Sequence, residues 1–599
     1  MILQELVRYY DRKAQSTDPA QRLPSFGLED KEIPFLVELT ADGHVVQLID
    51  TRSLDGKKLR AQSFLVPCGE KKTSGVRANL LWDAASYAIG VARERKSQGE
   101  LTPHAAFIAR IEALPASARQ LPGVAAVLAA LRRDDWALLH LSPAWPEILE
   151  TNPVLTFRLA GEAQLVCQHL AIAAHAAITD EDAPRALCLI DGTVQPIQRL
   201  HTAIKGVWGA QSSGANVVSF NARAFESYGK SERQGENAPI GERAAFAYTT
   251  ALNHLLAKDS RNRVQVGDAS TVFWSDAPTQ FDGEFTLADF FGETKDDPDR
   301  GVRAVQALHQ ALANGQLPVG ERDAQFFVLG LAPNAARISV RFWLRAPLSE
   351  LAPRILQHFE DLKVVRRYDS DPATPSLFRL LSGLALLGKL DNVPPRLAGE
   401  WMRAILEGQP YPVTLLNAAV IRCKAEQSAR DQNGKRKDNV PYLRAAVLKA
   451  WLNRDHRRTH PDALANHQYF KEELDMQQTD TPYLLGRLFS VLERVQEEAA
   501  RPGKLNSTIR DRYYGAASTT PVAVFTTLLR LKNAHIKKLS GGQSTNFERL
   551  IGEIMAPIDD FPRQLTLPQQ AKFALGYYHQ RQAFYKRKDD ASTPTSQEK

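Results

Sequence analysis

A Thr-Pro pair followed by apolar residues at helical spacing occurs twice in residues 476–599, and this pattern restricts that part of the chain to helices. At Thr481-Pro482 and Thr520-Pro521, threonine suits a helix N-cap, and proline suits the first helical turn because its missing N–H has no partner there. The residues that follow recur every three or four positions, as one buried helix face requires. They are Leu484, Leu485, Leu488, Leu492 and Val495, and then Val524, Phe525, Leu528, Leu529 and Ile536.

Two more helices are expected after these. Gly541-Gly542 should stop the second helix, and a third should run from Ser544 to Pro557. A fourth should begin near Pro568 and end in Lys586-Arg587-Lys588, whose charges suit a helix C-terminus. Four helices with short connections predict a bundle over residues 476–599 that is able to fold alone.

The chain before this bundle combines both kinds of secondary structure. Apolar runs at Ile33–Leu39 and His44–Ile49, joined by Thr40-Ala41-Asp42-Gly43, predict a β-hairpin. Beyond Leu377 no strand pattern appears. Other expected strands are Leu59–Val66, Ala186–Ile190, Thr271–Ser275, Gln325–Leu331 and Arg337–Leu344, the last two joined by a turn at Pro333-Asn334.

A chain of 599 residues is too long for one hydrophobic core, so several domains are expected. We predict an α+β multidomain protein, with a mixed α/β N-terminal part followed by an all-α C-terminal bundle. The predicted domains are residues 1–365, a mixed α/β N-terminal region; 377–475, a helical connecting region; and 476–599, the four-helix bundle.

The excess positive charge lies in the predicted bundle. Residues 476–599 contain 18 Lys and Arg and 12 Asp and Glu; subtracted from 75 and 68 for the whole chain, this leaves 57 and 56 elsewhere. A concentrated basic surface is typical of proteins that bind the phosphate backbone of nucleic acids. The alternative is a solvated helical face that serves solubility.

Cysteine usage and hydropathy indicate the compartment. Cys68, Cys167, Cys188 and Cys423 form no close pair, which disfavours a disulfide framework or a zinc ribbon and favours a reducing cytoplasm. No apolar run reaches the ~20 residues of a membrane-spanning helix. The opening MILQELVRYYDRKA reads as an amphipathic helix rather than a signal peptide. We expect a cytoplasmic protein that does not enter a membrane.

The sequence contains none of the common catalytic motifs: no G-x-x-x-x-G-K-[ST], H-E-x-x-H, G-x-S-x-G or C-x-x-C. The best metal candidate is His456 with His460, four residues apart, and His467 downstream. Arg457 and Arg458 lie between the first two, and their positive charge opposes a dication. A solvated, phosphate-facing surface is therefore the favoured interpretation.

Acidic pairs offer the remaining route to catalysis. Asp134-Asp135, Asp296-Asp297 and Asp559-Asp560 resemble parts of a two-metal nuclease, but they lie in loop-like surroundings beside prolines or basic residues. We expect no catalytic residue, metal or cofactor. Two alternatives stay open, a metal-dependent nuclease and a stand-alone DNA-binding regulator, although the latter would need a helix-turn-helix reader that we do not find.

Two loops have the composition of nucleic-acid-binding segments. The first, between an expected strand and an expected helix, offers lysines for phosphates, hydroxyls for phosphate oxygens and an asparagine for a base edge. Its candidate DNA-binding residues are Lys71, Lys72, Thr73, Ser74, Arg77 and Asn79. An ordinary basic connector would have the same composition.

The second loop combines glycines, neutral polar residues and a tryptophan. Gly206, Gly209 and Gly214 let the backbone approach a ligand, but their order is not that of a dinucleotide-binding motif. The indole would stack on a base or wedge between base pairs, unless it belongs to the core. The candidate DNA-binding residues here are Lys205, Trp208, Gln211, Ser212, Ser213 and Asn216.

Long segments in and around these loops resemble the Csd-type CRISPR-associated family, which supplies the large subunit of type I-C Cascade. The resemblance runs in order through most of the chain. It is carried by MILQELVRYYDRKA, the IPFLVEL hairpin, FLVPCGEKKTSGVRANLLWD, GVWGAQSSGANVVSFNARAFESYGK, NAPIGERAAFAYTTALNHLL, TVFWSDA and FFVLGLAPNAARISVRFW.

The resemblance implies a non-catalytic role in antiviral defence. It implies a complex with CRISPR RNA and other Cascade subunits, and contact with the protospacer-adjacent motif of target double-stranded DNA. It also implies help in opening that duplex and recruitment of a separate helicase–nuclease. The assignment of motif recognition to the two loops comes from their chemistry, not from the family.

An internal translation start is expected at Met476, one of four methionines in the chain and placed just before the bundle. The upstream Lys471-Glu472-Glu473 requires purine-rich codons, which resemble a bacterial ribosome-binding site. The resemblance implies that the family obtains its small subunit in this way. The alternative is that Met476 begins a loop and the bundle exists only as the end of the full chain.

Overall fold

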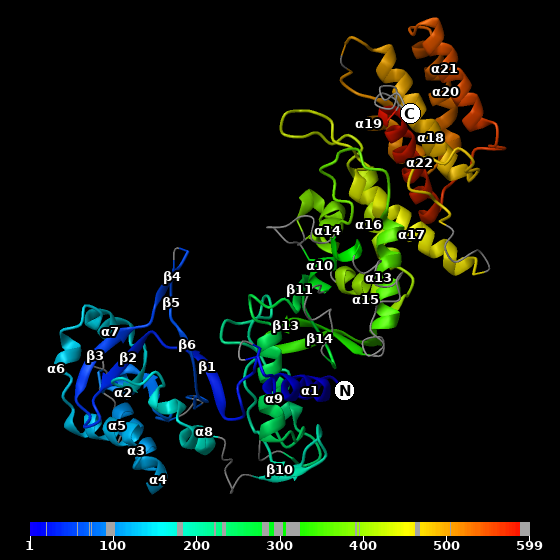
Figure 1. Cartoon of the computed structure of the whole chain (residues 1–599). Helices are drawn as coiled ribbons and strands as arrows, with labels where there is room; N and C mark the ends of the chain where they lie inside the picture. The colour runs from blue at the N-terminus through cyan, green and yellow to red at the C-terminus, as the bar shows by residue number, and fades with distance from the viewer. Residues whose placement is uncertain are drawn as a thin grey trace, which may run out of the picture. The chain divides into compact units, whose positions relative to one another are not determined.

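The computed structural model describes residues 1–18, 21–56, 58–70, 72, 75–91, 102–176, 184–220, 223–230, 235–277, 287–292, 303–306, 324–389, 392–394, 396–461, 468–503 and 505–586. Helices and strands occur together in it (Figure 1), so the expected α+β class is confirmed. By its internal contacts the chain forms two compact units, Met1–Thr202 with Val218–His254, and Ala203–Val217 with Leu255–Lys599. Each unit is described by itself.

The first unit is built on a four-stranded sheet of order β3-β2-β8-β7, in which β2 and β8 run parallel. The strands of the whole unit, including those that form separate two-stranded sheets, are β1 Leu28–Glu32, β2 Phe35–Leu39, β3 Val45–Asp50, β4 Ser53–Asp55, β5 Lys58–Arg60, β6 Ser63–Pro67, β7 Trp82–Ala84, β8 Val154–Leu159, β9 Arg185–Leu187 and β10 Val194–Pro196. Its helices are α1 Ile2–Ala14, α2 Ala85–Ala88, α3 Pro103–Glu112, α4 Ala116–Arg119, α5 Pro122–Arg133, α6 Ala137–His140, α7 Trp145–Thr151, α8 Leu170–Ala176 and α9 Glu242–Leu255, with short 3-10 turns at Val166–Gln168 and Arg223–Phe225.

The expected hairpin at the start of the chain is confirmed as β2 and β3, with Gly43 in the turn at φ +78°. All five residues of β2 are buried, which fits a central strand covered on both faces. Glu38 is tolerated there because Arg158 and Gln47 donate hydrogen bonds to its carboxylate at 2.8 and 2.7 Å. These donors lower the pKa of Glu38, Gln47 contributing most and Arg158 next.

Two expectations for this unit need correction. The strand expected over Leu59–Val66 is divided into β5 and β6, which pair with different partners, β4 and β1. The segment after the first candidate loop begins with β7 rather than a helix, because Trp82–Ala84 pairs with β8 at the edge of the sheet.

The second unit combines a four-stranded antiparallel sheet, order β11-β12-β13-β14, with helices. The strands are β11 Arg263–Val266, β12 Ala269–Ser275, β13 Gln325–Asn334 and β14 Arg337–Pro347. The helices are α10 Leu287–Phe291, α13 Leu348–Leu362, α14 Leu377–Leu384, α15 Leu397–Glu407, α16 Val413–Ala425, α17 Tyr442–Thr459, α18 Thr481–Ala499, α19 Ile509–Ala517, α20 Pro521–Ile536, α21 Gly541–Met555 and α22 Leu567–Lys586, with a 3-10 turn at Leu386–Gly388.

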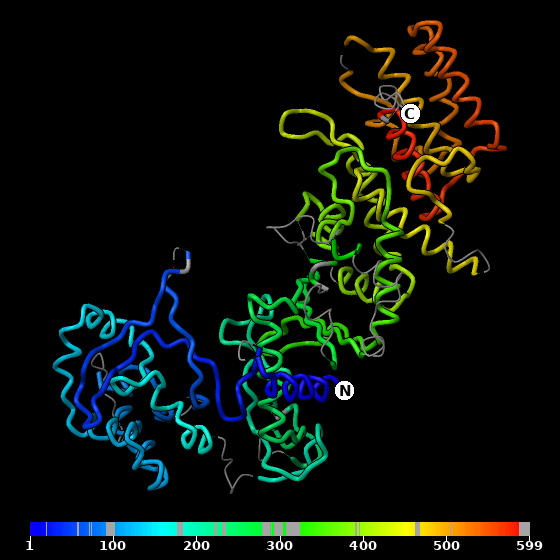
Figure 2. The backbone as a smooth tube through the Cα atoms, viewed as in Figure 1, coloured from blue at the N-terminus to red at the C-terminus, as the bar shows by residue number. Residues whose placement is uncertain are grey.

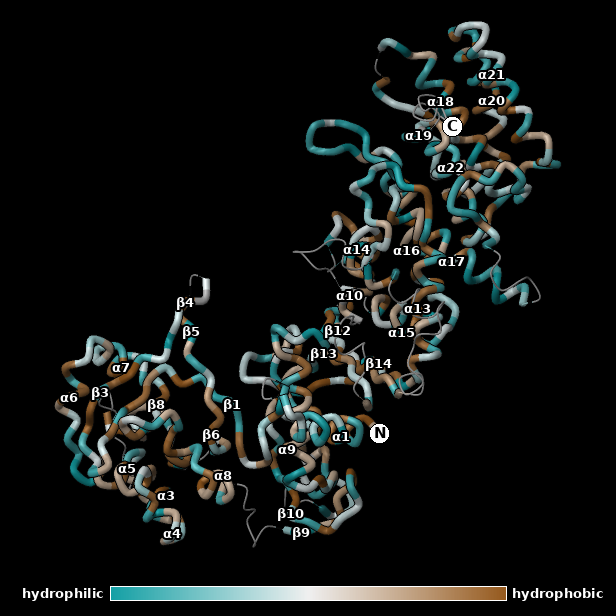
Figure 3. The backbone as a smooth tube through the Cα atoms, in the orientation of Figure 1, coloured by the Kyte–Doolittle hydropathy of each residue, from teal (hydrophilic) through white to brown (hydrophobic). Residues whose placement is uncertain are grey.

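The expected β13–β14 hairpin is confirmed, but its turn is not at Pro333-Asn334, because these two residues are paired with Ile338 and Arg337 as the last residues of β13. The turn lies at Ala335 and Ala336, with Ala335 in the left-handed region. In Figure 3, apolar and polar segments alternate along the helices of this unit, as amphipathic helices require. One hydrophobic core runs from Val264 to Tyr578 and includes residues of the sheet, of α13–α17 and of α18–α22. The domain limits expected at residues 365 and 475 both lie within this unit, and its core includes residues on both sides of each limit.

The bundle region contains five described helices, α18–α22, where four were expected. The additional helix, α19, is short and polar, so its sequence carries no clear apolar stripe. The N-cap of α18 is Asp480 rather than Thr481, and its carboxylate accepts from the Tyr483 N–H at 3.5 Å. Gly541-Gly542 opens α21 instead of closing α20, because Ser540 caps the helix ahead of it.

The charged segment that follows Lys424 connects α16 to α17 and reaches the bundle region. Its backbone leaves and returns as a long loop (Figure 2), closed by a bridge between Arg430 and Arg436. Arg430 donates to the Asn506 carbonyl at 2.5 Å, and Arg436 donates to the Leu505 carbonyl at 2.8 Å. Within the described residues, no helix combines the length and apolarity that crossing a membrane requires.

Candidate nucleic-acid interface

The first candidate loop lies in the first unit, between β6 and β7, and Asn79 holds it closed. The Asn79 side chain is buried. Its Oδ1 accepts from the Glu70 N–H at 2.8 Å, and its own backbone N–H donates to Asp83 Oδ2 at 2.9 Å. The first bond joins the two ends of the loop, and the second attaches Asn79 to Asp83 of β7. In this arrangement Asn79 acts by positioning the loop, since its carbonyl oxygen already has a protein donor.

Lys72 is part of the same support. Its ammonium group forms an ion pair with Asp83, whose side chain is 2% exposed, and lies 3.7 Å from the centroid of the Tyr87 ring. A carboxylate buried this deeply needs a paired cation, because leaving it unpaired costs several kcal/mol (~3–5). The pKa of Tyr87 is raised by burial and by the Asp83 charge. Lys72 therefore neutralises a charge inside the protein.

Arg77 is the more exposed of the two cations that the structure describes in this loop. Its side chain is 61% exposed, and its one ion-pair contact in the described structure is 3.9 Å from Glu70. Arg110 forms the shorter pair with Glu70, at 3.1 Å. The Arg77 guanidinium is thus loosely held and accessible to a phosphate. Lys71, Thr73 and Ser74 lie outside the described residues.

The second candidate loop belongs to the second unit, and its base is closed by backbone hydrogen bonds. Ile204 and Ala215 exchange N–H···O bonds of 2.8 and 2.9 Å. Gly206 and Gly214 have positive φ, at +85° and +95°. A Cβ on Gly206 would lie 2.5 Å from the Leu256 carbonyl oxygen, and one on Gly214 would lie 2.8 Å from that of Ile204. Both positions therefore require glycine for conformation and for space.

The sheet anchors this loop at two points. The Trp208 N–H donates to Ser270 Oγ on β12 at 2.9 Å. Asn216 pairs with the start of β14: its N–H donates to the Ala336 carbonyl at 3.2 Å, and its carbonyl accepts from the Ile338 N–H at 3.0 Å. A loop fixed at both sides to a sheet presents its side chains in a defined geometry.

Exposed groups of two kinds gather on this rigid loop. Trp208 is 57% exposed, so its ring is not a core residue and has a face available for stacking. Gln211, Ser212 and Ser213 are exposed at the tip, in a turn closed by the Gly214 N–H on the Gln211 carbonyl at 2.9 Å. Lys205 is also exposed, and Asn216 is half-buried. An indole beside neutral donors and acceptors suits contact with bases.

The structure places the two loops in different units, so each is a candidate interface by itself. Within each loop the candidate residues lie together, but some of them bond to other parts of the protein and others face solvent. Asn79 is buried and Lys72, although 32% exposed, is paired with the buried Asp83, whereas Arg77, Lys205, Trp208 and the tip Gln211–Ser213 face solvent.

The metal candidates do not converge in the described part of the chain. His456 stacks on His460 and on Tyr469, with ring centroids 4.3 and 4.1 Å away. Asp134 accepts from Trp136 Nε1 at 2.8 Å, and Asp135 caps a turn. His467 and Asp296-Asp297 lie outside the described residues. The described residues contain no group of three or more His, Cys, Asp or Glu placed to hold a metal ion.

A further surface feature was missed in the sequence. Four charged residues of α15 and its N-cap, Arg396, Glu400, Arg403 and Glu407, border a hollow of about 600 Å³ together with residues of the sheet. Their spacing of three or four residues places them on one helix face, which the sequence alone was able to indicate. The sheet residues opposite them come from distant segments, so the hollow itself required the structure.

Comparison with known protein families gives a match that covers nearly the whole chain. The family model of the CRISPR-associated protein Cas_Csd1 matches residues 6–585. A search of curated proteins gives no significant match.

Proposed function

We propose a role for this chain, which belongs to the Cas_Csd1 family of CRISPR-associated proteins and is therefore a Cascade subunit. It is the non-catalytic large subunit of a type I-C surveillance complex in the cytoplasm. In this role it binds target double-stranded DNA, senses the protospacer-adjacent motif, assists duplex opening and recruits the helicase–nuclease. The family match across residues 6–585 is the observation that carries the proposal.

The second loop is the proposed reader of the motif. In RNA-guided recognition, base pairing with the guide reads the target, and protein needs to read only a short duplex motif. The exposed tip Gln211–Ser213 offers the amide and hydroxyl groups that bond base edges, and Trp208 offers a ring that stacks or wedges. Lys205 is proposed to contact the DNA backbone. Asn216, where the loop joins the sheet, is proposed to hold the loop in place or to contact a nucleotide base of the motif.

The first loop is proposed to contact the phosphate backbone. Arg77, with Lys71, Thr73 and Ser74, supplies charge and hydroxyl groups for phosphate oxygens. Lys72 and Asn79 contribute to DNA binding by holding this loop in shape, which their bonds to Asp83 and to the Glu70 N–H support. The partners in this proposal are CRISPR RNA, other Cascade subunits, target DNA, the helicase–nuclease and a small subunit translated from Met476.

Replacing Gln211 by alanine is expected to reduce discrimination between correct and incorrect motifs by about 1–3 kcal/mol, the value of a lost base-edge contact. The unfolding temperature should not change, because Gln211 is exposed. Competition binding of the assembled complex with duplexes of both kinds measures the effect. Gln120→Ala, at another exposed glutamine, is the control and should leave discrimination unchanged. Unaltered discrimination in the Gln211 variant would place motif reading elsewhere.

Arg77→Ala should behave differently from the Gln211 variant. A lost phosphate contact weakens binding to all duplexes alike and reduces the slope of log affinity against log salt by about 1. The measurement is a salt titration of binding with both duplexes. A change in motif preference without a change in slope would contradict the backbone role of Arg77.

The internal start at Met476 completes the proposed function. A product of residues 476–599 retains α18–α22 and carries a net charge of +6, from 18 basic and 12 acidic residues. It would lack the Asp438 carboxylate, which pairs with Arg581 at 3.4 Å in the full chain. A basic helical product of this kind suits a subunit that lines the path of DNA.

Expression of the intact gene should therefore give a second product of about 14 kDa, the 124/599 share of 66.5 kDa. Synonymous recoding of Lys471–Glu473 should remove this product and leave the full-length protein unchanged, as detected with a C-terminal tag. Met476→Leu should also remove it. Persistence of the short product in the Met476 variant, or its absence from the wild type, would show that this start is not used.

A further inference from the structure

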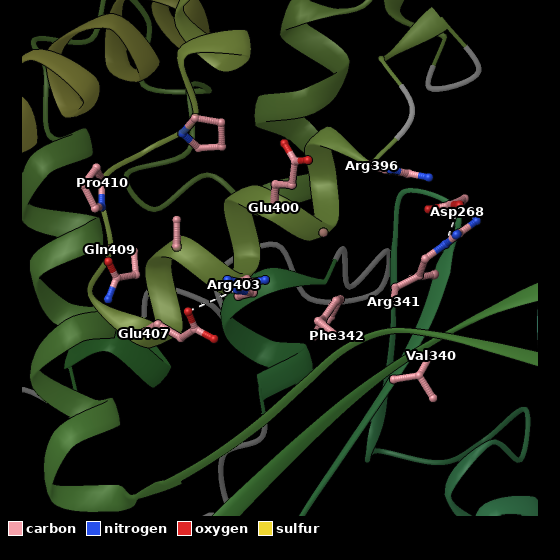
Figure 4. Close-up of a pocket in the computed structure, with 14 residues that line it drawn as sticks. Asp268, Val340, Arg341, Phe342, Arg396, Glu400, Arg403, Glu407, Gln409 and Pro410 are labelled. Atoms are coloured by element: carbon pink, nitrogen blue, oxygen red, sulfur yellow. Dashed lines mark hydrogen bonds and ion pairs between the residues drawn. The ribbon is translucent and has the colours of Figure 1, made fainter.

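The hollow beside α15 carries balanced charge. Figure 4 shows Arg341 of β14 beside Asp268, and Arg403 beside Glu407 within α15, each joined as an ion pair. The two pairs measure 2.8 and 3.1 Å. Arg396 and Glu400 border the same hollow and are exposed, and neither has an ion-pair partner among the described residues. One cation and one carboxylate thus remain available to an occupant.

A second hollow of about 480 Å³ adjoins the first, since Pro410 lines both. Its lining is largely apolar and includes Val413, Trp451 and Pro568. Val413, the first residue of α16, is 62% exposed, so its side chain is accessible to an occupant of this hollow. The rim again carries one charge of each sign, Asp455 and Arg458, paired at 2.9 Å.

The buried side chain of Arg454 holds in place the segment between α15 and α16, which lies between the two hollows. Its guanidinium donates to the Ala404 and Gln409 carbonyls, both at 2.7 Å, and lies 4.3 Å from the centroid of the Tyr411 ring. Trp451 Nε1 donates to the Pro412 carbonyl at 3.2 Å. The end of α15 and the start of α16 are therefore held by bonds that do not depend on an occupant. A preformed surface loses little entropy when it is filled.

We propose that the two adjoining hollows are a docking site for an extended polypeptide segment of another protein subunit of the Cascade complex. An apolar side chain of that segment contacts Val413, Trp451 and Pro568, and flanking residues of opposite sign pair with Arg396 and Glu400. A nucleic acid does not fit this surface: it would leave Glu400 against phosphates, and three arginines in the first hollow are offset by three carboxylates. The inference rests on Cascade membership and does not depend on motif sensing.

Site-specific photo-crosslinking in the purified complex tests the occupant. A benzophenone amino acid at position 413 should crosslink to a protein, within a segment that contains an apolar residue flanked by Asp or Glu and by Lys or Arg. The matched position is Val522, an exposed valine in the first turn of α20, which should not crosslink to that segment. A crosslink from position 413 to RNA or DNA, or no crosslink there in a fully assembled complex, would overturn the proposal.

Charge and shape variants supply a second measurement. Val413→Asp should lower the fraction of the crosslinked subunit retained in the complex by about tenfold or more, the loss expected for an anchoring side chain. Its unfolding temperature should be preserved, because an acidic residue is favourable at a helix N-terminus. Val522→Asp should change retention less than about twofold. Arg396→Glu should also lower retention, and full retention in both the Val413 and Arg396 variants would refute the docking site.

Discussion

Glu493→Gln is expected to lower the free energy of unfolding of the second unit by about 3–5 kcal/mol, the cost of removing one partner of a buried ion pair. Glu493 lies on α18 and is 2% exposed. Its carboxylate accepts from Arg581 at 3.0 Å, from the Tyr577 hydroxyl at 2.6 Å and from Thr508 Oγ1 at 3.0 Å. Arg510, which is 1% exposed, lies 3.8 Å away. Glutamine keeps the shape but leaves the buried Arg510 and the largely covered Arg581, which is 17% exposed, short of negative charge.

The control for this variant is Glu548→Gln in the same helical region. Glu548 is 45% exposed and pairs with Lys532 at 2.7 Å. A pair open to solvent contributes under about 1 kcal/mol, because water and salt screen it. Chemical denaturation of the two variants compares a buried and an exposed carboxylate with the same substitution. Two other carboxylates lie near these arginines: Asp438 is 3.4 Å from Arg581 and 3.9 Å from Arg510, and Asp511 is 4.0 Å from Arg510. Equal small losses would mean that these two carboxylates neutralise the arginines without Glu493.

Gly486→Ala is expected to destabilise the same unit by about 1–3 kcal/mol or more, although alanine is the better helix former. Gly486 on α18 and Gly576 on α22 lie where the two helix backbones are in close contact. A Cβ on Gly486 would be 1.9 Å from the Phe573 carbonyl oxygen, and one on Gly576 would be 2.1 Å from that of Tyr483. Backbone atoms cannot rotate away as a side chain can, so the helices must separate.

The matched substitution is Gly552→Ala on α21, where an added Cβ meets nothing within 4 Å. There alanine should stabilise by about 0.5–1 kcal/mol through helix propensity. Thermal unfolding should therefore move in opposite directions for one chemical change at two positions. Stabilisation by Gly486→Ala would contradict the close helix contact.

The helices and hairpins that were predicted correctly share a local signal. The stripe of α18 and the turn between β2 and β3 are visible within a few residues, because periodicity and turn chemistry act over short distances. Pairing between strands that are far apart in sequence leaves no such local signal. The strand β8 was therefore not predicted, although it pairs with β2. The close approach of Gly486 and Gly576 is likewise a property of the assembled helices.

The candidate loops also combine features that the sequence predicts with features that depend on tertiary packing. Their glycines, hydroxyls and cations indicated polar surface segments, and Arg77 and the tip Gln211–Ser213 are exposed in the structure. The burial of Asn79 was not predictable from its neighbours in sequence, because it depends on how Asp83 enters the sheet edge. Composition thus locates a loop, whereas tertiary packing decides which of its polar groups remain free to bind.

The most direct test of the central claim is to purify the tagged full-length chain from cells that express its CRISPR locus and to identify what is bound. The account predicts other CRISPR-associated proteins together with RNA derived from the CRISPR array. It also predicts that the purified complex binds duplexes with the correct motif more tightly than duplexes without it. A chain that purifies alone, without RNA and without motif preference, would contradict the proposed role.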